Sequence, residues 1–129
     1  MTKILPILTV FLSFILFSPI SLGEWKFVSS NESGDDFFVD YDRIRKNNGY
    51  VYYWSRNEFK KPLIEKYYSN VLYSMVDCEV IREKYLSSNF YEGHMGKGDS
   101  LTVEGDGKWT YPPPGSVLET ILKSVCNSI

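Results

Sequence analysis

The chain has 129 residues, of which 43% are hydrophobic and 16% are aromatic. The part that follows Gly23 carries 13 basic and 16 acidic side chains, a formal charge of −3, so it has no general attraction for a phosphate backbone, and nucleic acid is not an expected partner. Its length allows one compact domain with one hydrophobic core and excludes two.

The first 23 residues have the pattern of a secretory signal peptide. Lys3 gives a short basic start, an apolar run follows over residues 4–20, and the small residues Ser21 and Gly23 precede Glu24. Two prolines shorten the clean apolar stretch below the roughly 20 residues that span a bilayer. We therefore expect residues 1–23 to be removed, leaving residues 24–129 as one exported domain with no integral membrane span.

The exported part is predicted to form an antiparallel sheet, because its many aromatic residues alternate with polar ones. We expect a turn at 47–49, where Asn-Asn-Gly tolerates positive φ, a break at 60–62, a loop over 93–98 and a hairpin turn at 104–107. The sheet is expected to have six strands, give or take one, drawn from segments 25–28, 37–41, a strand that starts at 50, 67–77, 79–91, 101–103 and 108–111.

A helix is predicted to follow the rigid segment 112–115. Ser116 and Glu119 form a capping-box pattern, and the apolar residues 117, 118, 121, 122 and 125 lie on one stripe of a helix. The predicted fold class is therefore α+β: an antiparallel β-sheet of about six strands with a C-terminal helix packed on it.

Cys78 and Cys126 are the two cysteines of the chain. An even number of cysteines in a small exported domain predicts a disulfide, here between the end of a strand and the helix. The absence of a cysteine near the expected cleavage site leaves no acceptor for a lipid. We therefore expect the protein in the periplasm, at the cell surface or secreted.

No catalytic residue is predicted. His94 is the sole histidine and lies in a polar loop, where a surface position is expected, and bridged cysteines cannot act as nucleophiles. We therefore expect no enzyme activity.

Neither a metal nor a cofactor is predicted. Two segments resemble calcium sites, the acidic cluster at Asp35, Asp36, Asp40 and Asp42 and the segment 104–107, but neither has the ligand spacing of a known calcium loop. A solvated strand edge and a hairpin turn are the expected structures. Asp40 is also expected to cap the turn that leads into Arg43.

Candidate binding residues come from the basic groups and from one aromatic strand. Strand alternation places Tyr52, Trp54 and Arg56 on the same face of the sheet. Basic side chains near such a face suit an acidic protein or polysaccharide. The candidate binding residues are Lys60, Lys61, Arg82, Lys84 and Trp54.

A series of landmarks follows a distinctive order along the chain. An Asp-Cys pair ends a strand, and a Trp, then Pro-Gly-Ser, then a terminal Cys complete the series. The landmarks are Trp25, 38–40, Ile44, 50–54, Asp77, Cys78, Arg82, Gly96, Gly98, Trp109, 114–116 and Cys126. In this order the chain resembles the bacterial surface-adhesin protein E-like family over essentially the whole exported part. The resemblance implies a sheet joined to a helix by a Cys78–Cys126 disulfide.

The resemblance also implies a non-catalytic binding domain that adheres to host or extracellular-matrix proteins, since the namesake adhesin binds vitronectin and laminin and can self-associate. The namesake is a lipoprotein, whereas this chain lacks the lipidated cysteine. We expect a protein partner, from the extracellular matrix or the cell envelope, and a homodimer formed by sheet edges. The alternative function is a periplasmic small-ligand-binding or envelope-maintenance protein whose aromatic residues line a cleft.

Overall fold

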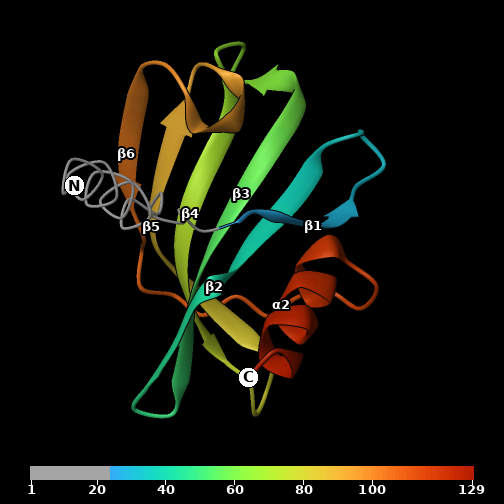
Figure 1. Cartoon of the computed structure of the whole chain (residues 1–129), viewed down its shortest axis with the longest axis vertical. Helices are drawn as coiled ribbons and strands as arrows, with labels where there is room; N and C mark the ends of the chain where they lie inside the picture. The colour runs from blue at the N-terminus through green and yellow to red at the C-terminus, as the bar shows by residue number, and fades with distance from the viewer. Residues whose placement is uncertain (1–23) are drawn as a thin grey trace, which may run out of the picture.

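The computed structural model describes residues 24–129, so the predicted signal peptide, 1–23, lies outside the described residues. One antiparallel sheet holds six strands in the order of the sequence, β1-β2-β3-β4-β5-β6 (Figure 1). The α-helix α2 follows the sheet and lies beside β1 and β2. The elements are β1 Lys26–Ser30, β2 Asp36–Asn47, β3 Tyr50–Leu63, β4 Tyr67–Asp77, β5 Arg82–Tyr91, the 3-10 turn η1 His94–Gly96, β6 Ser100–Glu104 and α2 Val117–Asn127.

Short turns explain why each strand pairs with the next. Asn48 and Gly49 both have positive φ, 52° and 83°, as the two-residue turn between β2 and β3 requires. The predicted turn at 47–49 is therefore confirmed. The break predicted at 60–62 does not end the strand, since β3 continues to Leu63 and turns at Ile64 and Glu65. It coincides with an interruption in the pairing of β3 with β4, between Glu58 and Leu63.

The core lies between one face of the sheet and α2. Val51 and Tyr53 of β3 alternate with half-buried neighbours and point to the helix, as the two-residue period of a strand dictates. The helix begins at the predicted cap, where the Ser116 hydroxyl accepts a hydrogen bond from the Glu119 amide at 3.2 Å. Seven buried residues form this core: Val39, Val51, Tyr53, Val76, Ile121, Leu122 and Val125.

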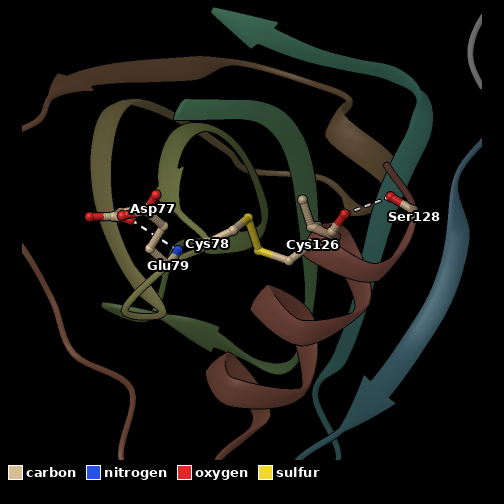
Figure 2. Close-up of a disulfide and its surroundings, with 6 residues drawn as sticks. Asp77, Cys78, Glu79, Cys126 and Ser128 are labelled. Carbon is tan, nitrogen blue, oxygen red and sulfur yellow. Dashed lines mark hydrogen bonds between the residues drawn. A yellow bond between two sulfur atoms is a disulfide. The ribbon is translucent and has the colours of Figure 1, made fainter. Parts of the chain in front are cut away.

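The predicted disulfide is present. Figure 2 shows Cys78, in the turn after β4, bonded to Cys126 in the last turn of α2, with a Cα–Cα distance of 5.8 Å. The Asp77 carboxylate holds this turn by accepting a hydrogen bond from the Glu79 amide at 3.1 Å. The bond therefore ties the end of the helix to the end of the sheet where β4 and β5 meet.

The end of the chain departs from the predicted hairpin. After Glu104 the chain does not reverse. It bulges away and rejoins the same edge of β5, where Thr110 and Glu83 exchange two backbone hydrogen bonds of 2.7 and 2.9 Å. The chain can continue in the same direction because Gly105 packs directly against β5, where its amide donates a hydrogen bond to the Leu86 carbonyl at 3.0 Å. Segment 108–111 is therefore no strand of its own.

Asp40 also differs from its expected solvated position, since it is only 1% exposed. Its carboxylate accepts a hydrogen bond from the Asp42 amide at 3.2 Å and pairs with Arg43 at 3.2 Å. The expected capping by Asp40 is therefore confirmed, but it takes place inside the protein, where β2 changes register against β3.

Candidate binding surface on the open face of the sheet

The helix covers one face of the sheet, and the opposite face carries an aromatic surface. Every second side chain of β3, β4 and β5 points to this face, and cross-strand pairing places these side chains next to one another. We call this surface the open face. It consists of Tyr52, Trp54, Tyr73, Met75, Arg82, Lys84 and Trp109.

Three aromatic rings form a row across β3 and β4. Trp54 and Tyr73 are direct cross-strand partners, with ring centroids 4.6 Å apart, and the Tyr52 ring stacks with Tyr73 at a centroid distance of 6.0 Å. All three side chains are half-buried, so each keeps part of its ring available to a partner. Aromatic side chains with this exposure are the residue type that dominates binding energy in protein interfaces.

Cations flank the row at its β5 end. The Arg82 guanidinium lies 4.0 Å and the Lys84 ammonium 4.6 Å from the centroid of the Trp109 ring, as in cation–π contacts. Arg82 also donates to the Tyr111 hydroxyl at 3.3 Å and to the Asp77 carboxylate at 3.0 Å. These hydrogen bonds, that of Tyr111 first, raise the pKa of Arg82, so the surface keeps its positive charge.

The other end of the open face is bounded by η1. Glu58 of β3 accepts hydrogen bonds from the Met95 amide at 2.9 and 3.1 Å and lies 3.2 Å from the His94 ring nitrogen Nδ1. The same carboxylate pairs with Arg56 at 3.0 Å. His94 is exposed, as expected, and Glu58 anchors η1 to the sheet.

The Arg56 guanidinium does not belong to the available surface. It is 7% exposed and lies between the rings of Phe38, at 4.6 Å, and Trp25, at 5.3 Å. Buried between two rings and paired with Glu58, it holds β1 and β2 against β3.

The sequence profile of the family described as Surface-adhesin protein E matches residues 25–127. The chain belongs to this family. The observed sheet, helix and Cys78–Cys126 disulfide agree with what the resemblance implied. No curated protein matches the chain significantly.

Solved structures of Haemophilus influenzae protein E share the fold of this member of the surface-adhesin protein E family. Crystal form II has a TM-score of 0.64 at 15% identity, covering 86% of this chain and 94% of that one. The selenomethionine form has a TM-score of 0.59 at 15% identity, covering 86% and 93%. Protein E from a non-typeable strain has a TM-score of 0.52 at 16% identity, covering 84% and 80%. At this identity the likeness concerns the fold.

The structure brings together three of the five candidate binding residues of this family member. Trp54, Arg82 and Lys84 lie on the open face. Lys60 and Lys61 do not, since they are exposed near the far end of β3, where the Lys60 amide donates to Asp35 at 2.9 Å. Two lysines beside each other in sequence thus lie apart from Arg82 and Lys84.

Tyr73, Met75 and Trp109 are the members of the open face that the sequence did not assign to it. Tyr73 could have been found, because it lies opposite Trp54 once β3 and β4 are paired. Trp109 could not, because the predicted hairpin assigned it to a separate strand. Among the described residues, no helix has the length and apolar character to cross a bilayer.

Proposed function

We propose that this chain is an exported, non-catalytic binding domain that attaches to a protein partner through the open face. The stacked row of Trp54, Tyr73 and Tyr52 beside the cations Arg82 and Lys84 carries the proposal. Membership of the surface-adhesin protein E family supports protein binding as the class of function. Vitronectin and laminin, the targets implied by the family resemblance, are the first partners to test.

Charge favours an acidic partner segment at this surface. Arg82 and Lys84 both lie close to the Trp109 ring, and Lys84 has no carboxylate partner among the ion pairs of residues 24–129. A carboxylate of the partner could therefore form an ion pair with the Lys84 ammonium at the edge of the aromatic surface. Such a rim charge affects the association rate more than the final affinity.

Binding of the purified protein to immobilised vitronectin and laminin tests the proposal. Trp54→Ala is expected to weaken binding by at least tenfold, since truncating a central interface aromatic typically lowers the binding free energy by about 2 kcal/mol. Lys84→Gln is expected to slow association, with the effect shrinking as salt rises.

Lys123→Gln is the matched control, because Lys123 is an exposed lysine on α2, on the opposite side of the sheet. It should bind as the unmodified protein does. Equal binding by the Trp54→Ala variant and the unmodified protein, or no binding to either matrix protein, would contradict the proposal.

We also propose that residues 1–23 are a cleaved export signal and that the protein functions outside the cytosol. The Cys78–Cys126 disulfide supports this, because such bonds persist in oxidising compartments. Fractionation of cells, with mass spectrometry of the N-terminus, should find the chain starting at Glu24 outside the cytosol. A cytosolic chain that retains Met1 would oppose it.

A homodimer through a sheet edge remains a proposal. All five residues of the edge strand β6 are exposed, including Leu101 and Val103 at 50% and 45%. An exposed edge strand can pair with a second copy. Light scattering at several concentrations should show mass doubling that Val103→Lys reduces, and a constant monomer mass would refute the dimer.

A further inference from the structure

A cavity of about 370 Å³ lies on the helix side of the sheet, opposite the open face. It forms because α2 covers the sheet through Ile121, Leu122 and Val125, while its first turn leaves the neighbouring strands uncovered. Its apolar walls include Phe37 and Leu118. The volume falls in the range of about 300–1,000 Å³ that is typical of small-molecule sites.

A second cavity, of about 480 Å³, adjoins the first and shares Leu72 and Tyr85 with it. It runs over β5 to Phe90 and to the segment where the chain bulges after Glu104. Because they share these two residues, we treat the two cavities as one cleft across the sheet. We call this the helix-side cleft; Phe37, Leu72, Glu83, Tyr85, Phe90 and Leu118 define it.

Glu83 lies at the floor of this cleft with one carboxyl oxygen unpartnered. It has no exposed surface, Oε1 accepts a hydrogen bond from the Tyr53 hydroxyl at 2.5 Å, and Oε2 has no partner. Burial raises the pKa of Glu83, and the neighbouring hydroxyls of Tyr53, Ser74 and Tyr85 offset part of this rise. Among the ion pairs of residues 24–129, none includes Glu83. The Oε2 atom of this buried carboxyl is therefore available to accept a hydrogen bond from a ligand.

The second part of the cleft has the same character. The Asn70 side chain is 5% exposed, and its Oδ1 also lacks a donor. Glu104 and Asp106 add two further carboxylates to the lining. No lysine, arginine or histidine lines either cavity, whereas Arg82 and Lys84 face the opposite side of the sheet. The cleft is therefore rich in acceptors and negative in charge.

Side chains cap part of the start of α2. The Ser116 hydroxyl accepts from the Glu119 amide, and the Glu119 carboxylate accepts from the Gly115 amide at 3.2 Å. These side chains cap the positive end of the helix. An anionic ligand in the cleft would meet the carboxylates of Glu83, Glu104 and Asp106.

We propose that the helix-side cleft binds a small organic cation, a protonated amine with an aromatic or aliphatic body. The ammonium donates to the free Oε2 of Glu83, and the body packs against Phe37, Leu72 and Leu118. The ring of Tyr85 lies where it can also contact the cation. This site is independent of the proposed adhesive function, because it uses the opposite face of the sheet.

Three matched probes test the charge requirement: 2-phenylethylammonium, 2-phenylethanol and phenylacetate. Each is titrated at pH 7 into oxidised protein expressed from the full chain, with calorimetry for affinity and NMR for location. The ammonium probe is expected to bind at least tenfold more tightly than the alcohol, and phenylacetate most weakly. Equal or stronger binding of phenylacetate, or no binding by any probe, would overturn the proposal.

Variants locate the site. Glu83→Gln keeps an acceptor for the Tyr53 hydroxyl but removes the charge. It should lower the affinity for the ammonium probe at least tenfold and leave the affinity for the alcohol unchanged. Leu118→Trp fills the cavity from the half-exposed helix surface and should weaken both probes, even where Glu83→Gln does not fold. Trp54→Ala, on the open face, should change neither. Unchanged ammonium affinity in a folded Leu118→Trp variant, or NMR shifts confined to the open face, would refute the site.

Discussion

Gly105 lies so close to β5 that a Cβ atom at this position would be 1.7 Å from the carbonyl oxygen of Tyr85. This contact lets the chain pass Glu104 without reversing and return to β5 at Thr110. Trp109 therefore reaches Arg82 and Lys84 on the open face. One residue without a side chain thus decides which surface receives a tryptophan.

Gly105→Ala is expected to displace the segment that carries Trp109. A clash with backbone cannot be relieved by a side-chain rotation, so we expect a loss of about 1–3 kcal/mol in the free energy of unfolding. The tryptophan emission should also shift as Trp109 leaves the cations. Gly107→Ala is the matched control: a Cβ there meets nothing within 4 Å, and its φ of 74° adds strain only. Equal spectra for Gly105→Ala and the unmodified protein would contradict this account.

Removal of the disulfide should lower stability more than any single side-chain truncation on the surface. The bond closes a loop with a sequence separation of 48 residues, for which chain entropy gives about 4 kcal/mol. Urea unfolding of the Cys78→Ser, Cys126→Ser double variant measures the loss. Reduced unmodified protein serves as the control and should unfold at the same urea concentration. A loss below about 1 kcal/mol would show that the helix is held by packing alone.

The stability of the protein should carry a pH dependence from Glu83. Burial raises the pKa of Glu83 above its ordinary value of 4.5, so between 4.5 and the raised pKa the folded protein holds a proton that the unfolded chain has released. This contribution is full below pH 4.5 and is lost as pH rises through the folded pKa, by at most about 1.4 kcal/mol per pH unit.

Urea unfolding at several pH values checks the sign. As pH rises from 4.5, the free energy of unfolding of the unmodified protein should fall relative to that of the Glu83→Gln variant. Glu104→Gln replaces an exposed carboxylate on β6 and serves as the control: its free energy of unfolding should change with pH as that of the unmodified protein does. A difference that moves the other way would mean that a cation pairs with Glu83 in the folded protein.

The turn between β3 and β4 should accept a stabilising change. Ile64 and Glu65 have φ values of 53° and 56°, a region that side chains, and β-branched ones above all, adopt at an energetic penalty. The Ile64→Asn, Glu65→Gly double variant supplies the preferred turn sequence and should raise the free energy of unfolding by about 1 kcal/mol. Ile64 is 81% exposed, so no packing is lost. A lower melting temperature would contradict the turn geometry.

The sequence predicted the fold well because its signals are local. Alternation along 67–77 matches β4 at both ends, and Ser116 with Glu119 marks the start of α2. Strand ends were less accurate: β3 runs through Pro62, and β5 begins at Arg82 after a turn that includes Cys78. Strand ends depend on pairing with neighbouring strands, which no local pattern records; the register of β3 against β4, for example, is interrupted between Glu58 and Leu63.

The candidate surface was predicted only in part, for the same reason. Trp54, Arg82 and Lys84 share a face because of the strand period and the register of three strands. Lys60 and Lys61 carry the same charge as Arg82 and Lys84 but lie near the far end of β3, away from the open face. Charge and residue type are readable from the chain, whereas proximity depends on register.

The sequence by itself determined the sheet, the helix with its cap and the cysteine pair, because periodicity, turn chemistry and capping act within a few residues. Tertiary structure alone decided that Trp109 joins the open face, that Asp40 and Glu83 are buried, and that a cleft remains beside α2. These features depend on how close distant segments approach, as Gly105 does to Tyr85, and such contacts between distant segments leave no pattern along the chain.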